Sequence, residues 1–176
     1  MAMQRLTQPV TDADRVLGSL GADITIVEYG DYDCPHTRAA HGVLKQLMQE
    51  RPGQLALVFR CFPLRHMHQN AEALARLMKE ITEPERYWAA HDALMALRRM
   101  SLAAGYDTLT SLGFDVAELE RAAESVASLV QLDVERGLAD GVHSTPSFFF
   151  NGAPWDGHYD IAALRKQLDA ALERSA

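Results

Sequence analysis

Val27 to Thr37 reads Val-Glu-Tyr-Gly-Asp-Tyr-Asp-Cys-Pro-His-Thr and places a cysteine where an expected strand ends and an expected helix begins. An apolar run that starts at Ile24 stops at Gly30, and apolar side chains recur at helical spacing after the proline. Cys34 therefore occupies a helix N-terminus, where free N–H groups and the helix dipole favour an anion. A thiolate is such an anion, so the sequence predicts a cysteine that is nucleophilic at neutral pH.

The three residues after the cysteine each have an expected role. Pro35 fits the first helical turn, where its missing N–H costs nothing, and we assign it to the substrate-binding surface. His36 is either a solvated side chain or a source of positive charge near the sulfur. Thr37 cannot attack sulfur, but its hydroxyl can donate a hydrogen bond to a Cys34 thiolate. We therefore predict catalytic roles for Cys34, His36 and Thr37.

A second informative stretch, Gly141 to Gly152, reads Gly-Val-His-Ser-Thr-Pro-Ser-Phe-Phe-Phe-Asn-Gly and lies far downstream. Its phenylalanine run predicts a strand over residues 147–151. The Asn-Gly pair that ends the run favours a hairpin turn into a short strand near Trp155.

These motifs together resemble the DsbA-like branch of the thioredoxin superfamily. In that branch a strand carrying a glutamate, here Glu28, leads into Cys-Pro-His-Cys or Cys-Pro-Tyr-Cys. Val58 to Leu64 reads Val-Phe-Arg-Cys-Phe-Pro-Leu and is similar to the family's second core strand. The likeness runs from about Arg15 to Leu172 and is interrupted at Thr37, which stands where the family has its second cysteine.

The resemblance implies an α/β thioredoxin-like fold, βαβ and then ββα, with an inserted helical subdomain. We expect residues 1–176 to form one domain and residues 66–140 to be its helical insertion. Thr145 and Pro146 would form a cis-proline loop beside Cys34, where the backbone of Thr145 can pair with an extended peptide. Glu28 would be a proton acceptor beneath the active site, unless it lies at a strand end that reaches water.

Hydrophobic periodicity predicts the elements of this fold. We expect strands over residues 24–29 and 55–62, the second of them buried on both faces as in a parallel pair. A helix over residues 37–50 would connect them, ended by Pro52-Gly53. The remaining helices are expected over residues 68–80, 84–99, 115–140 and 161–172, with turn breaks at Pro84, Gly105 and Gly113.

Composition excludes several other classes of protein. The net charge of −7 argues against nucleic acid or an anionic membrane surface as a partner. No run reaches the length of a membrane span, and the first residues lack the apolar core of a secretory signal, so we expect a cytoplasmic location. The seven histidines show no paired spacing typical of zinc, and no metal is expected.

Thr37 is the last residue of the tetrad Cys34-Pro35-His36-Thr37, and it determines the expected chemistry. A dithiol enzyme resolves its mixed disulfide with its second cysteine, which this tetrad lacks. We therefore expect a thiol–disulfide oxidoreductase that uses one activated cysteine and forms mixed disulfides with a disulfide-containing protein or a small-molecule thiol. No bound cofactor is expected, and glutathione is a candidate co-substrate.

Two other function classes remain open. One is a glutathione-dependent transferase or isomerase, although such relatives of this fold generally place serine at the position of Cys34. The other is a non-catalytic module that binds partners at the cis-proline loop. Cys61, the second cysteine, is either a packing residue of the core strand or a resolving partner for Cys34.

Overall fold

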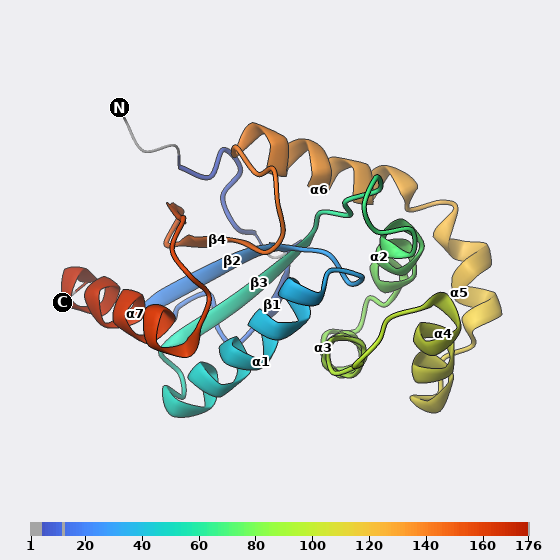
Figure 1. The fold of residues 1–176 in the computed structure, drawn as a ribbon, viewed down its shortest axis with the longest axis horizontal. Coiled ribbons are helices and arrows are strands. Elements are labelled where there is room, and N and C mark those ends of the chain that lie inside the picture. The colour runs from blue at the N-terminus through green and yellow to red at the C-terminus, as the bar shows by residue number, and fades with distance from the viewer. Residues whose placement is uncertain (1–4, 12, 176) are drawn as a thin grey trace.

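A computed structural model describes residues 5–11 and 13–175, and it contains one five-stranded sheet (Figure 1). The spatial order of the strands is β1-β3-β2-β4-β5. Strands β1 (Arg15–Leu17), β2 (Ile24–Gly30), β3 (Leu55–Cys61), β4 (Ser147–Phe150) and β5 (Ala153–Trp155) make up this sheet. The mixed sheet and its helices confirm the predicted α/β thioredoxin-like fold.

Strand β2 lies at the centre of the sheet. It runs parallel to β3, from the pair Ile24–Leu55 to the pair Gly30–Cys61. Parallel neighbours need a crossover connection, which α1 (Pro35–Glu50) supplies. On its other side β2 runs antiparallel to β4. The start of α1 and the start of β4 therefore lie at the same end of the sheet.

The two faces of the sheet are covered by different helices. One face packs against apolar side chains of α1 and of α7 (Ile161–Ser175), among them Leu44, Leu47, Leu164 and Leu168. The other face carries Val27, Tyr29 and Val58 and meets α6 (Ala127–Ala139). Because both faces are covered, all seven residues of β3 are buried, as its unbroken apolar pattern predicts.

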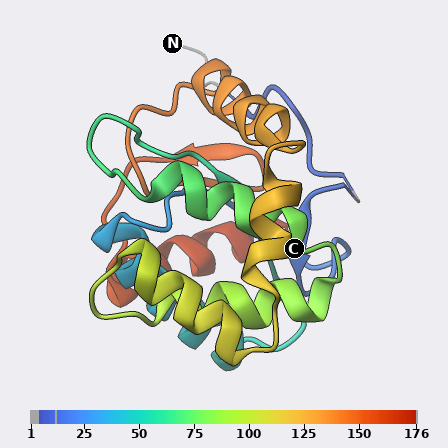
Figure 2. The same cartoon turned by 90° about the vertical axis from the view of Figure 1, so that its right-hand side faces the viewer.

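Between β3 and β4 the chain forms helices that pack on one another at the end of the sheet where β2 stops (Figures 1 and 2). Four of them precede α6: α2 (Ala71–Glu80), α3 (Pro84–Met95), α4 (Leu102–Ser111) and α5 (Val116–Ala123). The expected helical insertion over residues 66–140 contains all of them, although its limits as a subdomain stay a prediction.

The structure corrects two expectations in this region. Gly105 lies inside α4 and is not a turn break. A Cβ at Gly105 would lie 2.7 Å from Cδ2 of Leu74, so the glycine allows α4 to approach α2 closely. The helix expected over residues 115–140 is divided into α5 and α6. Outside this region, β1 is a three-residue edge strand antiparallel to β3 that was not predicted from the sequence.

The close approach of α1 to the sheet predicts the effect of a substitution at Gly30. A Cβ there would lie 2.7 Å from Cζ of Phe59 and 2.9 Å from Cγ2 of Thr37. We expect Gly30→Ala to lower the free energy of unfolding by about 1–3 kcal/mol because the core is overpacked. Gly42→Ala is the matched control, since a Cβ at that helical position meets nothing within 4 Å. The control should gain about 0.5–1 kcal/mol in urea denaturation, and equal effects at the two positions would contradict the packing argument.

Candidate active site around Cys34

Cys34 is the N-cap residue of α1, and Pro35 occupies the first position of the helix. The extended backbone of Cys34 precedes the first helical turn, whose N–H groups lack partners within the helix, and the Cys34 side chain forms no capping hydrogen bond with them. The side chain is only 2% exposed. Its thiol donates a hydrogen bond to the carbonyl oxygen of Thr145, with Sγ and O 3.4 Å apart.

Thr145 and Pro146 lie directly before β4 and are joined by a cis peptide bond. The register between β2 and β4, in which Tyr29 pairs with Ser147, brings this loop against the start of α1. Thr145 is 7% exposed, and its Oγ1 has no hydrogen-bond partner among the described residues. Cys34 and Thr145, which the sequence analysis assigned to one site, are thus in direct contact.

Thr37 is fully buried one turn into α1. Its Oγ1 lies 3.4 Å from the backbone N–H of Asp31 and accepts a hydrogen bond from it. Within the described residues no hydrogen bond joins this hydroxyl to Cys34. The expected bond from Thr37 to the sulfur is therefore absent in this structure, because the hydroxyl turns toward the loop that precedes the cysteine.

His36 lies on the exposed side of the same helical turn. Its Nδ1 is 2.5 Å from the hydroxyl of Tyr159, a residue of the segment that leads into α7. The two rings meet edge to face. This contact between α1 and the α7 segment was not predicted, because nothing in the sequence relates residues so far apart.

Glu28 lies in the middle of β2, level with Phe59 on β3 and Phe148 on β4. Its side chain is fully buried, so the alternative in which Glu28 lies at a strand end that reaches water is wrong. Neither carboxyl oxygen has a hydrogen-bond partner among the described residues. Burial disfavours the charged form and raises the pKa of Glu28 to about 8. At neutral pH the Glu28 carboxyl group is thus mostly protonated. It must lose this proton before it can act as the expected proton acceptor.

Two aspartates that were not predicted as site residues, Asp31 and Asp33, anchor the loop that carries Cys34. Asp31 accepts hydrogen bonds from the N–H of Leu64 and from Nδ1 of His68, at 2.9 and 2.8 Å. Asp33 accepts two more from the backbone and side chain of Asn70. These bonds fasten the Cys34 loop to the connection between β3 and α2. The signal in the sequence that could have identified them is their position, one and three residues before the cysteine at the helix start.

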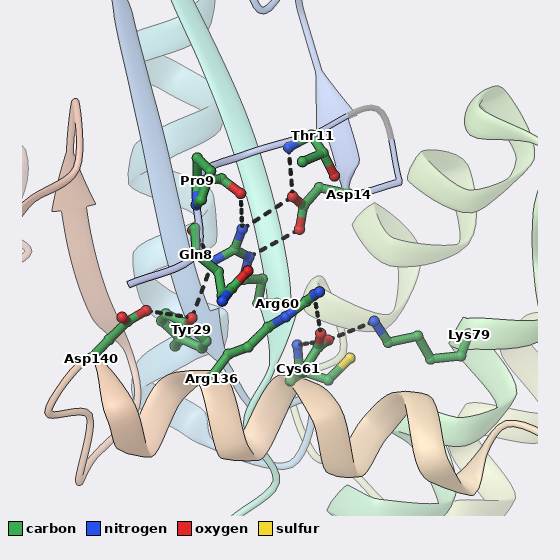
Figure 3. A network of polar contacts seen from close by, with 11 residues as sticks. Gln8, Pro9, Thr11, Asp14, Tyr29, Arg60, Cys61, Lys79, Arg136 and Asp140 are labelled. Carbon is green, nitrogen blue, oxygen red and sulfur yellow. Dashed lines mark hydrogen bonds and ion pairs between the residues drawn. The ribbon is translucent and has the colours of Figure 1, made fainter. Parts of the chain in front are cut away.

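A second polar network lies behind the central strand, on the face toward α6 (Figure 3). The guanidinium of Arg60 donates to both carboxylate oxygens of Asp14, to the carbonyl oxygens of residues 8 and 9, and to the hydroxyl of Tyr29. Tyr29 in turn donates to Asp140 at 2.7 Å. A buried arginine is tolerated because its donors are satisfied, and it fastens the N-terminal segment to the sheet.

Cys61 is buried at the end of β3 and forms no disulfide. Figure 3 shows it beside Lys79, and its backbone N–H donates to Asp133. Burial raises the pKa of the Cys61 thiol to about 12, so the thiolate needed for exchange is scarce at neutral pH. These features favour the packing reading of Cys61 over the resolving one.

A cavity of about 580 Å³ opens beside the cis-proline loop. Its wall includes His36, Thr145, Pro146, Trp155 and Tyr159. Among the described residues, no group of three or more histidine, cysteine or acidic side chains is arranged to hold a metal ion. The site is therefore best described as a buried thiol at a helix start, next to a loop and a cavity.

The sheet order, the helix-start cysteine and the adjoining cis-proline loop define a protein of the thioredoxin-like class. The family model described as thioredoxin matches residues 10–170, and the chain belongs to this family. The predicted resemblance is thereby confirmed.

Solved structures agree with this assignment. Oxidised BdbD from Bacillus subtilis superposes with a TM-score of 0.82 at 19% identity, covering 97% of this chain and 99% of that one. A thioredoxin-like oxidoreductase from Silicibacter pomeroyi DSS-3 has a TM-score of 0.77 at 26% identity, covering 94% and 93% of the two chains.

Curated relatives are longer proteins. The chain is 34% identical over 172 residues to a Na(+)/H(+) antiporter NhaA of Nitrosospira multiformis, a match that covers 95% of this chain and 27% of the relative. The chain thus spans about a quarter of the length of the curated relatives it matches. No helix among the described residues has the length and hydropathy needed to cross a membrane.

The raised pKa of Glu28 predicts a specific dependence of stability on pH. Because the pKa is about 8 in the folded protein and 4.5 as a free side chain, ionisation is disfavoured by folding. The contribution of Glu28 to the stability of the wild-type protein therefore falls as the pH rises from 4.5 toward 8. Glu28→Gln removes this titration, so its free energy of unfolding relative to wild type should increase by about 4 kcal/mol between pH 4.5 and pH 8.5.

Urea denaturation at a series of pH values measures this difference. Glu124→Gln, at an exposed position, is the matched control and should show no such trend. A difference between Glu28→Gln and wild type that stays constant across the pH range would show that the Glu28 carboxyl titrates like a solvent-exposed one.

Proposed function

We propose that this protein is a thiol–disulfide oxidoreductase that works through a single cysteine. The observation that carries the proposal is the contact between the Cys34 thiol and the carbonyl oxygen of Thr145, at the N-terminus of α1. This arrangement joins a sulfur at a helix start, where negative charge is stabilised, to a loop edge that offers backbone groups to a bound peptide. The oxidoreductase description of the Silicibacter pomeroyi protein supports the same class of reaction.

The exchange step follows ordinary thiol–disulfide chemistry. Cys34 loses its proton to solvent, and the thiolate attacks one sulfur of a substrate disulfide. A new bond forms between Sγ and that sulfur while the substrate S–S bond breaks. The departing thiolate takes up a proton and leaves as a thiol. The Cys34 sulfur is oxidised and the departing substrate sulfur is reduced, so the step balances without an outside oxidant or reductant.

The second half of the cycle needs a thiol from outside the tetrad. Thr37 has no sulfur, and the Cys61 thiol is buried with a pKa of about 12. We infer that a free thiol, with glutathione or a protein cysteine as candidates, attacks the mixed disulfide and releases Cys34. The oxidised product is then a disulfide between the substrate and that thiol. No bound cofactor takes part in this scheme, and the expected cytoplasmic location stays a prediction.

A non-catalytic binding module is the second candidate, and one observation favours it. The Cys34 side chain is only 2% exposed, so a disulfide must displace its neighbours to reach the sulfur. The transferase or isomerase alternative has less support, since the chain keeps cysteine at position 34 where such relatives generally have serine.

Intact mass spectrometry after incubation with oxidised glutathione tests the proposal. We expect wild-type protein to gain one glutathione on Cys34 and to lose it when excess reduced glutathione is added. Cys61→Ala should behave like wild type, and Cys34→Ser should gain nothing. Loss of two hydrogens from wild type would instead mean a bridge between Cys34 and Cys61. No reaction at Cys34 would favour the binding module.

The variant Thr37→Cys tests the reason given for single-cysteine chemistry. Residues 34 and 37 lie three apart at the start of α1, within reach of one another. We expect the variant to lose two hydrogens on oxidation and to retain no glutathione, because its second cysteine resolves the adduct. A stable glutathione adduct on this variant would show that Thr37 does not set the outcome.

A further inference from the structure

We propose that the cavity beside Thr145 selects disulfides that carry a positively charged group next to their sulfur, and that it disfavours glutathione disulfide. This inference rests on the proposed function, since it concerns which partner reaches Cys34. It is carried by the charges of the cavity wall and by two buried, unpartnered polar atoms that belong to residues of that wall.

The charged residues of the cavity wall are of one sign. Asp140 and Asp156 are the acidic residues of the wall, while no lysine or arginine lines the cavity among the described residues. His36 is the single basic side chain in the wall, and its Nδ1 is engaged by Tyr159. A cleft lined by one sign of charge raises the local concentration of ligands of the opposite sign. The net charge of −7 on the chain acts in the same direction.

The two carboxylates differ in how much of their charge reaches the cavity. Asp140 is 4% exposed and accepts hydrogen bonds from Thr7 and Tyr29, so its charge is partly offset within the protein. Asp156 lies on the exposed segment after β5, and no hydrogen bond or ion pair engages its side chain among the described residues. Asp156 is therefore the carboxylate free to meet a ligand.

The cation nearest to Cys34 along α1 lies outside the cavity wall, although it keeps its charge because its partners are neutral carbonyl groups. The Arg38 guanidinium donates to the backbone carbonyls of Tyr32 and Asp33, at 3.2 and 3.0 Å. It is thus occupied by the loop before the cysteine and is not part of the cavity wall.

Two buried polar atoms of the cavity-lining residues lack partners. Oγ1 of Thr145, a residue only 7% exposed, and Nε1 of Trp155 form no hydrogen bond within the described residues. Buried polar groups are normally satisfied, so unpartnered ones at a cavity wall point to a ligand that supplies the missing bonds. Thr145 also accepts the bond from Cys34, which places this polar edge next to the reacting sulfur.

The dimensions and charges fit a small or narrow ligand. A volume of about 580 Å³ lies within the ordinary range of ligand pockets and accommodates an aminothiol or one basic side chain. Glutathione carries two carboxylates and one ammonium group, so its disulfide brings net negative charge to a negative wall. The favoured chemistry is an ammonium or guanidinium group near a disulfide, from either a small aminothiol or a basic residue beside a peptide cysteine.

Rates of mixed-disulfide formation with three small disulfides test this inference. Cystamine, 2-hydroxyethyl disulfide and 3,3′-dithiodipropionate are similar in size and carry positive, no and negative charge. Each rate constant at Cys34 is divided by the rate of the same disulfide with the urea-unfolded protein, which removes intrinsic reactivity. We expect the cationic reagent to exceed the anionic one by about three- to tenfold at low ionic strength, and the ratio to approach one in 1 M salt.

Two variants with the same loss of charge separate the cavity from the protein as a whole. Asp156→Asn should reduce the ratio by about twofold or more, whereas Asp107→Asn, at an exposed position on α4, should leave it unchanged. Two peptide disulfides, one with lysine and one with glutamate beside the cysteine, distinguish a peptide source from a small aminothiol.

Equal normalised rates, or a faster anionic reagent, would overturn the inference and leave the proposed function standing. A ratio that falls equally in both variants would also overturn it, because the selection would then come from net charge alone. No reaction of Cys34 with any of the three reagents would overturn the proposed function together with the inference.

Discussion

The pairing of β2 with β3 on one side and β4 on the other is the constraint on which the site depends. The parallel pair requires α1 as its crossover, which turns the end of β2 directly into a helix start at Cys34. The antiparallel pair brings the loop before β4 to the same end of the sheet. Cys34 and Thr145 are thus held in contact although 111 positions separate them in the chain.

Burial on both faces of this sheet divides the ionisable groups into two kinds. Arg60 stays charged inside the protein because Asp14 and the carbonyls of the N-terminal segment satisfy its donors. The Glu28 carboxyl group and the Cys61 thiol form no ion pair that would stabilise their charged forms among the described residues. Burial therefore keeps both groups mostly protonated at neutral pH. Of the two cysteines, only Cys34 lies at a helix start, and this difference in position separates their expected chemistry.

Local sequence patterns predicted the helix and strands that build the site, but they could not predict the side-chain contacts between residues far apart in the chain. The apolar run before Gly30 and the proline after Cys34 were enough to place β2 and α1, and the resemblance placed Thr145 beside the sulfur. The hydrogen bond of Thr37 to Asp31 and the contact of His36 with Tyr159 depend on side-chain rotamers and on tertiary packing, which no spacing encodes. Gly105 was misread because a glycine that allows helices to approach looks the same in sequence as one that ends a helix.

The central claim is that the fold makes Cys34 the reactive thiol and Cys61 an inert one. The most direct test is the alkylation rate of each cysteine in the native protein at pH 7, followed by peptide mass spectrometry after quenching. We expect iodoacetamide to modify Cys34 under native conditions, while Cys61 is protected until urea unfolds the chain. Modification of Cys61 at the same rate as Cys34, or faster, would contradict it.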